Sequence, residues 1–453
     1  MRISRNQLIW ATMAVLVVAA VVIVFSMMAK SPHSWESKRK SMISKYTRML
    51  NSGNVDQRRE AVMLLGGVGD KSTTPILIKA LKDSDDDVRI NALVSLRAWA
   101  DTSSLKEVTA LLAERNDRIR AAAAYTLAKL GGSPVLPKIK PLLKDTSLLV
   151  REQVVSALGL FPAEQVMPDL IRTLEDRDIP IRRRALWVMT NYPGPETTSQ
   201  LLKVLNGNVP ELHSDAAMAL GKLHAKEAVP DLIRLAESKD AFVSRAVVMA
   251  LGSIQDSRAE NVLIRLLTNR EPATRLEAAA SLGRMGTKSA LGALTARLYE
   301  PDHQVRAAVV SAIGQLVDDA HSEVLFKMAG DKEEFVREEA AKAFGRLQLK
   351  SSFSTLLRLL GDPSEQVRWA TVSALEVMDD PKVAAALKKA AAVEKSTWLK
   401  NYMNNAVSMN ASHQGNDGVI VTPAPEAQAA PPALAKGTTV TAAPKAPVNK
   451  PKR

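Results

Sequence analysis

Residues 83–96 read DSDDDVRINALVSL, and this stretch decides the fold. Counted from Arg89, apolar residues stand at positions −1, +3, +4 and +7. That spacing puts their side chains on one face of an α-helix. The stretch therefore predicts an amphipathic helix, which we call helix B.

The same pattern recurs every 31 residues, and nine of its eleven arginine positions hold arginine. Glycine follows the +7 position at 66, 159, 221, 252, 283, 314 and 345, where we expect each helix B to end. An upstream apolar stripe predicts a companion, helix A, with proline in its first turn at 75, 137, 168 and 230. The eleven positions are Arg58, Arg89, Arg120, Arg151, Arg182, His213, Ser244, Arg275, Arg306, Arg337 and Arg368.

Two short amphipathic helices cannot bury their apolar faces alone, so the repeats must stack on one another. The sequence therefore predicts an all-α fold, an α-solenoid of about eleven 31-residue helix-turn-helix repeats. The motif Asp83-x-x-x-Asp87-Val88-Arg89-x-x-Ala92-x-x-x-Leu96 resembles the short HEAT-like repeats of the phycobilisome-lyase type, over about residues 55–405. The resemblance implies that helix B lines the concave side. The family it points to includes scaffolds, chromophore lyases and an iron-dependent hydroxylase.

An acidic residue usually stands six positions before the repeated arginine, and it is lost at Gly207 and Ser238, where the arginine is lost too, as His213 and Ser244. We expect the carboxylate to bond the guanidinium, in the same or an adjacent repeat, as a structural ladder. Because the ladder fails twice there, residues 190–245 are predicted to form a hinge. The predicted ladder residues are Asp83, Arg89, Glu114, Arg120, Asp145, Arg151, Asp176, Arg182, Glu300, Arg306, Asp331, Arg337, Asp362 and Arg368.

Position +5 of helix B points away from its apolar face, and its row includes aromatic and Met residues where a polar row is expected. Exposed Trp, Tyr, Met and Arg are the usual composition of a protein-binding hot spot. The alternative is that curvature half-buries these side chains against neighbouring repeats. The predicted partner-binding groove consists of Tyr125, Arg183, Arg184, Trp187, Met218 and Met249.

The two ends differ from the body. Residues 6–29 carry no charge and are long enough to cross a bilayer, which predicts a transmembrane helix with lipid contact through residues 7–29. After residue 410 the chain is rich in Ala, Pro and Lys, which predicts a disordered tail whose basic end suits an anionic surface. The expected divisions are 1–30, tip and anchor; 31–54, linker and capping helix; 55–410, solenoid; and 411–453, tail.

The expected localisation is a bacterial inner membrane, crossed once. Basic residues after the span favour a body inside the cytoplasm, whereas the short charged tail before it favours a body outside. We expect the repeats outside.

The net charge of +13 divides into +5 for residues 1–40, +3 for residues 411–453 and +5 for the long body between them, which argues against a specific nucleic-acid interface. The chain has no cysteine and no His-Glu dipeptide. We therefore expect no catalytic residue, metal or cofactor. The predicted function is a membrane-tethered protein–protein interaction scaffold, and the alternative is a lyase or chaperone-like enzyme subunit that acts on a partner protein.

Overall fold

The computed structural model describes residues 32–317, 322–378 and 380–414, and all of its regular elements in these ranges are helices. The chain divides into two compact units, Met1–Asp380 and Pro381–Arg453. The described part of unit 1 holds helices α2 to α23, and that of unit 2 holds α24 and α25.

Helix B of each repeat contains the repeated arginine or its replacement. An N-cap side chain begins several of these helices, as when Asn116 accepts from the backbone N–H of Arg118. The B helices are α3 (Val55–Val68), α5 (Asp86–Leu96), α7 (Asp117–Gly131), α9 (Leu148–Leu158), α11 (Ile179–Met189), α13 (His213–Lys222), α15 (Ala241–Ile254), α17 (Pro272–Arg284), α19 (His303–Leu316), α21 (Glu334–Leu347) and α23 (Glu365–Glu376).

Most A helices are shorter than the B helices, and most follow a 3₁₀ turn such as Lys71–Thr73. Three of the four prolines lie in a first helical turn as expected, but Pro168 lies inside its helix, because α10 begins earlier in its repeat than the other A helices do. The A helices are α4 (Thr74–Ala80), α6 (Leu105–Ala110), α8 (Leu136–Ile139), α10 (Ala163–Thr173), α12 (Pro195–Leu205), α14 (Val229–Leu235), α16 (Glu260–Leu266), α18 (Leu291–Thr295), α20 (Glu323–Met328) and α22 (Phe353–Leu359).

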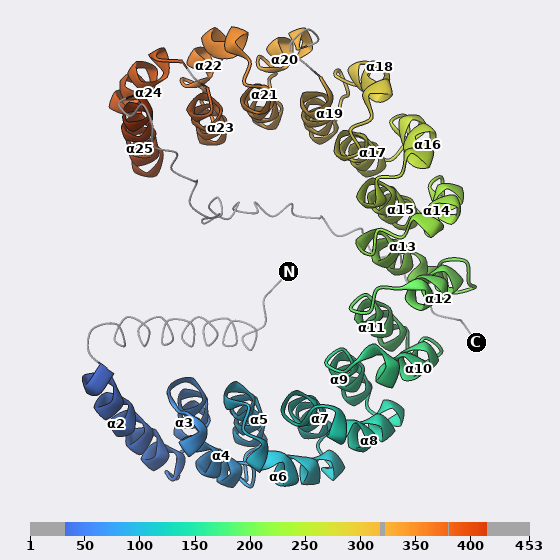
Figure 1. Ribbon diagram of the computed structural model, residues 1–453, viewed down its shortest axis with the longest axis vertical. Helices are drawn as coiled ribbons and strands as arrows, with labels where there is room; N and C mark the ends of the chain where they lie inside the picture. Colours follow the sequence, from blue (N-terminus) through green and yellow to red (C-terminus); the bar gives the residue numbers. More distant parts are fainter. Residues whose placement is uncertain (1–31, 318–321, 379, 415–453) are drawn as a thin grey trace, which may run out of the picture. The chain divides into compact units, whose positions relative to one another are not determined.

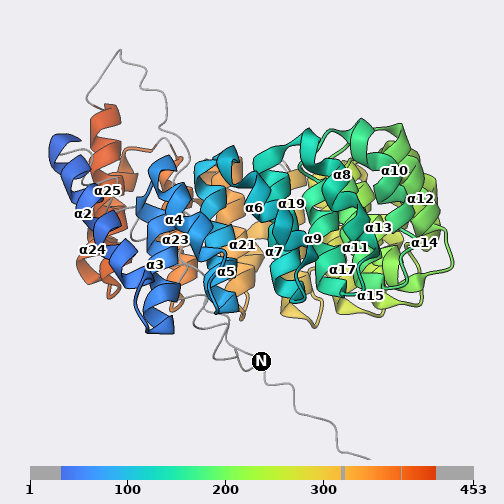
Figure 2. The same ribbon diagram turned by 90° about the horizontal axis from the view of Figure 1, so that it is seen from below.

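In unit 1 the helix pairs follow one another along a curved row, with the B helices on its inner side and the A helices on its outer side (Figure 1). Consecutive B helices pack against one another, and their axes run across the row (Figure 2). The apolar −1, +3, +4 and +7 positions, such as Val88, Ala92, Leu93 and Leu96, are buried between helices. Position +5 therefore faces the inner side, which we call the inner face.

The repeated glycines do not end the B helices as expected. Six of the seven lie inside a helix, and only Gly159 directly follows one. A Cβ atom on Gly66 would lie 2.4 Å from Ser95 Oγ of the next helix B, and one on Gly221 would lie 2.7 Å from the Cα atom of Ala250. The glycines thus allow adjacent B helices to approach closely.

Helix α2 (Pro32–Leu50) packs on α3 and covers the first repeat with Ile43, Tyr46, Met49 and the buried Leu50. In the described part of unit 2, α24 (Lys382–Val393) packs on α25 (Thr397–Gln414) around Leu387, Leu399 and Met403. The predicted domain limits remain predictions, and most of the expected tail lies outside the described residues.

The expectation of a transmembrane helix ahead of the solenoid is corrected here. In the part of the chain that the structure describes, no helix is both long and apolar enough to cross a membrane. Even α2, with 19 residues, carries charged side chains such as Glu36, Lys38 and Arg39. Residues 7–29, on which the expectation was based, lie outside the described residues. The single-pass inner-membrane localisation and the extracytoplasmic placement are therefore not supported.

Candidate functional site: the inner face

The repeated arginines form a ladder of ion pairs between adjacent repeats. Seven of the nine guanidinium groups pair with the carboxylate 25 residues later, in the turn of the next repeat. Arg120, for example, donates to both Asp145 carboxylate oxygens at 2.9 Å and to the Glu114 backbone carbonyl at 2.7 Å. The pairs are Arg58–Asp83, Arg89–Glu114, Arg120–Asp145, Arg151–Asp176, Arg275–Glu300, Arg306–Asp331 and Arg337–Asp362.

This geometry shows which of the two arrangements left open by the sequence the molecule adopts. The arginine binds the backbone of its own repeat and the side chain of the next repeat. The hydrogen bond from Arg120 lowers the pKa of the Asp145 carboxyl and outweighs the effect of burial, which raises it. The terminal Arg368 donates to the Asp362 carbonyl of its own turn at 2.8 Å.

Three consecutive interfaces in the described chain lack this pair. At the first, Arg182 donates to the backbone carbonyl of Asp176 in its own repeat and faces no carboxylate in the next. His213 Nε2 lies 2.9 Å from the Gly207 carbonyl oxygen, so the imidazole keeps the contact within the repeat that arginine makes elsewhere. The positions that lack a pair are Arg182/Gly207, His213/Ser238 and Ser244/Asn269.

The predicted groove residues around Trp187 form a connected cluster on α11 and α13. Asp215, only 7% exposed, accepts from Arg183 Nε at 2.6 Å and from Trp187 Nε1 at 3.3 Å. The Lys222 ammonium lies 6.0 Å from the centre of the Trp187 ring and donates to Thr190 Oγ1 at 2.9 Å. Trp187 is thus held by a buried carboxylate on one side and a cation on another.

Of the other predicted groove residues, Arg184 lies at position +2, and Tyr125, Met218 and Met249 lie in the +5 row with Trp187. Arg184 pairs with Glu152 of the preceding helix B at 2.6 Å. Tyr125 is half-buried beneath the Arg97 guanidinium, whose carbon atom lies 5.2 Å from the ring centre, and burial lowers the pKa of Arg97. Met218 is half-buried, whereas Met249 is 37% exposed. Neighbouring repeats therefore cover much of the row, and Met249 is more exposed than Tyr125, Trp187 or Met218.

The sequence did not single out Asp215, Glu152, Lys222 or Arg97 as partners of the groove residues. The sequence spacing could have indicated two of these contacts. Asp215 lies 32 residues after Arg183, and Glu152 lies 32 residues before Arg184, so each separation is close to the 31-residue length of one repeat. Side chains on the same face of adjacent B helices are placed to meet at that separation.

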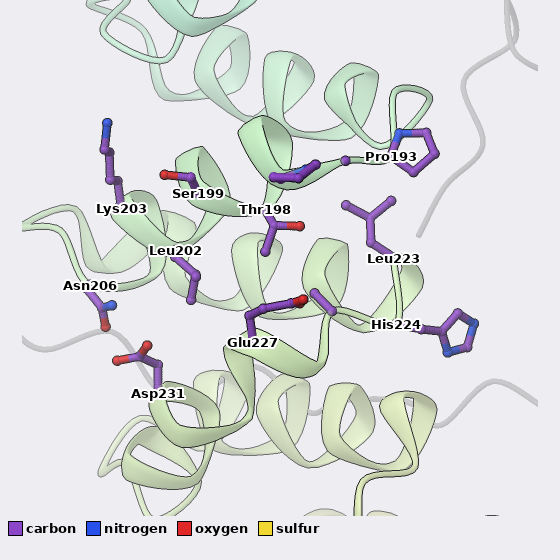
Figure 3. Close-up of a pocket in the computed structure, with 13 residues that line it drawn as sticks. Pro193, Thr198, Ser199, Leu202, Lys203, Asn206, Leu223, His224, Glu227 and Asp231 are labelled. Carbon is purple, nitrogen blue, oxygen red and sulfur yellow. The ribbon is translucent and has the colours of Figure 1, made fainter.

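An open groove of about 820 Å³ lies on the outer side, between α12 and α14, at the second interface that lacks an arginine pair, that of His213 and Ser238 (Figure 3). Figure 3 shows Thr198, Leu202 and Glu227 turned toward the groove, whereas Lys203 and His224 point away. Asp231 at its edge is paired with Arg234 at 3.0 Å. Within the described residues, no group of three His, Asp or Glu side chains is placed to hold a metal ion.

The repeated helix pairs have a counterpart among known protein families. The family model for HEAT repeats matches seven overlapping segments, residues 45–128, 77–148, 136–212, 198–270, 245–314, 293–353 and 322–401. The chain is a HEAT repeat protein. Among curated proteins, no sequence matches it.

One solved structure similar to this HEAT repeat protein concerns Kap95p binding to RanGDP and nuclear import. The two chains are 12% identical, with a TM-score of 0.62, and the match covers 87% of this chain and 65% of that chain. A structure of Kap121p bound to Pho4p has 14% identity, a TM-score of 0.53 and coverage of 85% and 51%. The chain thus spans less than two thirds of these matched chains. At such identities the likeness shows the fold alone.

The HEAT repeat protein also resembles the complex of CpcE and CpcF of phycocyanin lyase from Nostoc sp. PCC7120, with 23% identity over 53% of this chain and 93% of that chain. The TM-score of 0.34 is too low to support an argument about activity.

Proposed function

We propose that the protein is an interaction scaffold whose inner face binds a partner protein or peptide around Trp187, Met218 and Met249. The main support is that three consecutive B helices present these large apolar side chains at the same helical position, with ion pairs beside them. An apolar centre within a polar rim is the usual anatomy of a binding hot spot. A structure of similar fold shows Kap121p bound to Pho4p, which illustrates that such a solenoid can hold a protein.

The two methionines are better test positions than Trp187 and Arg183. Both of the latter contact the buried carboxylate of Asp215, so removing them would leave that charge unpaired and destabilise the fold. The side chains of Met218 and Met249 do not pair with a buried charge. Methionine also adapts its shape to different partners at a small conformational cost.

The experiment places a photo-crosslinking residue at position 249 of the full-length chain and identifies the protein that it captures. The purified partner is then titrated against the Met218→Ala plus Met249→Ala variant. We expect the affinity to fall at least tenfold, about 1.4 kcal/mol or more, with an unchanged melting temperature.

The matched control is Leu357→Ala, which removes a 40% exposed apolar side chain from the outer helix α22. Its affinity should stay within twofold of the wild type. Equal crosslinking from positions 249 and 357, or unchanged binding by the methionine variant, would contradict the proposal.

The alternative, a lyase or chaperone-like enzyme subunit, has no specific observation in its favour. The inner-face carboxylates Glu152 and Asp215 are held in ion pairs with Arg184 and Arg183. The lining of the outer groove includes Thr198, Ser199, His224 and Glu227, but none of these side chains hydrogen-bonds to another of them.

A further inference from the structure

The inner face is divided lengthwise by charge. Toward the N-terminal ends of the B helices, positions +1 and +2 mix acids with bases, and several of them pair, as in Arg183–Asp215 and Arg184–Glu152. Toward the C-terminal ends, positions +8 and +9 contain no acidic residue in the first ten repeats. The same two positions hold five cations, Arg97, Lys129, Lys222, Arg284 and Arg346, which we call the cationic row.

None of the five cations is in an ion pair with a carboxylate of residues 32–317, 322–378 or 380–414. Instead, neutral groups hold three of them toward the preceding repeat. Lys222 Nζ donates to Thr190 Oγ1 at 2.9 Å, and Arg284 Nη2 donates to Ser281 Oγ at 3.0 Å beside Gly252. Arg346 Nη2 lies beside Gly314 and donates to the backbone carbonyl of Ser311 in the preceding helix B at 3.5 Å. Neutral groups thus position three of the cations, and no carboxylate of the described residues pairs with any of the five.

The simplest structural account is that each cation offsets the negative end of its helix dipole, because all five lie in or next to the last turn of a helix B. That account fits each residue singly. It does not explain why the two positions contain no acid over ten repeats, while +1 and +2 contain six in the same helices. A row of cations without a carboxylate partner among the described residues instead has the electrostatic character that attracts an acidic partner.

We propose that the cationic row binds an acidic segment of the partner, in which Asp or Glu side chains alternate with apolar ones. This inference rests on the proposed function, since the apolar side chains would lie on Trp187, Met218 and Met249. A protein segment fits better than nucleic acid, because Glu60 and Glu277 lie on the same face and would repel a continuous polyanion.

The spacing favours an extended segment. Lys222, Arg284 and Arg346 lie at every second repeat, and adjacent packed helices are about 8–10 Å apart, so these cations recur roughly every 20 Å. Such a distance corresponds to about six residues of extended chain. A segment with acidic clusters at that interval could contact all three.

The test uses three fluorescein-labelled probes with the full-length chain at 150 mM salt. One is an acidic peptide of four Glu-Leu-Glu-Ser-Phe units, the second has Lys in place of Glu, and the third is a 20-nucleotide oligo-dT. We expect the acidic peptide to bind at least tenfold more tightly than either of the others. Lys129→Glu plus Lys222→Glu plus Arg284→Glu should remove that preference.

The matched control is Lys79→Glu plus Lys138→Glu plus Lys327→Glu, which makes the same change in net charge on exposed lysines of the outer helices α4, α8 and α20. Its affinity for the acidic peptide should stay within twofold of the wild type. If the inner glutamate variant does not fold, the corresponding glutamine variant replaces it and should still lose at least fivefold in affinity.

Three results would overturn the cationic row. Two of them are equal binding of the acidic and basic peptides and equal loss of affinity in both triple variants. The third is binding of oligo-dT as tight as that of the acidic peptide, which would make the row a general polyanion surface. Partner crosslinking at position 249 is measured in parallel, so that the proposed function can stand when the row fails.

Discussion

At the scale of single residues, a glycine inside a helix can allow close packing against a neighbouring helix instead of ending its own helix. Gly66 and Gly67 are adjacent in α3, but only Gly66 faces the next helix B. A Cβ atom on Gly66 would lie 2.7 Å from the Ser95 Cβ atom, and Ser95 is fixed by its hydrogen bond to the Val62 carbonyl at 3.0 Å. A Cβ atom on Gly67 would meet nothing within 4 Å.

We therefore expect the two alanine substitutions to act in opposite directions. Gly66→Ala should lower the free energy of unfolding by about 1–3 kcal/mol, because it forces adjacent helices apart. Gly67→Ala should raise it by about 0.5–1 kcal/mol, because alanine loses less conformational entropy in a helix. Urea unfolding of the two variants and the wild type measures both effects. A stabilising Gly66→Ala would disprove the packing role.

At the scale of the elements, the ladder joins the turn of one repeat to helix B of the preceding one. Both oxygens of Asp145 accept from Arg120, and these side chains are only 9% and 14% exposed. Replacing Asp145 by Asn should cost about 1.5–3 kcal/mol, because the remaining guanidinium is largely buried. The exposed Arg265–Glu237 pair between neighbouring repeats is the control, and Glu237→Gln should cost less than about 1 kcal/mol.

The same pair predicts the pH dependence. Arg120 lowers the pKa of Asp145 in the folded state, so the folded protein binds fewer protons there than the unfolded chain does. The stabilisation is therefore complete above the unfolded pKa of about 3.9 and is lost as the pH falls through the lower folded value. Unfolding of the wild type and Asp145→Asn at pH 7 and pH 3 should show a smaller difference at pH 3. A constant difference would contradict the pKa argument.

The strict 31-residue period was enough to predict the helix pairs and the burial of positions such as Val88 and Leu96, because each repeat solves the same packing problem. It could not predict the role of Gly66, which depends on how closely the next helix approaches. Nor could the period show whether Arg120 pairs with the carboxylate in the turn of its own repeat or with the one in the turn of the next repeat. The sequence pattern indicated the row of side chains around Trp187. It could not predict that Asp215 and Lys222 contact Trp187, because those contacts depend on how strongly the row of repeats curves.

At the scale of the whole of unit 1, the ladder is interrupted rather than uniform. Four pairs precede the gap and three follow it, while the three interfaces from Arg182 to Asn269 lack a pair. The outer groove between α12 and α14 lies at the second of these interfaces. In a solenoid each repeat contacts only its neighbours, so a weak interface is not compensated by distant parts of the chain.

Because the ladder is interrupted in this way, we still predict that residues 190–245 form a hinge. The pairing between adjacent repeats changes which substitutions should rigidify this hinge. Because each carboxylate serves the arginine of the preceding repeat, Gly207→Asp would pair with Arg182, and His213→Arg needs Ser238→Asp rather than a carboxylate at 207. Backbone amides in 190–245 should exchange faster than those in 80–180 or 290–375. The triple variant should slow amide exchange in 190–245 by at least threefold, because it rebuilds two consecutive pairs.

The control, Gly207→Asn with His213→Gln and Ser238→Asn, adds side chains of similar size without charge and should leave amide exchange in the hinge fast. Uniform exchange along the wild-type array would refute the hinge, and equal protection by the charged and uncharged variants would refute the missing ion pairs as its cause.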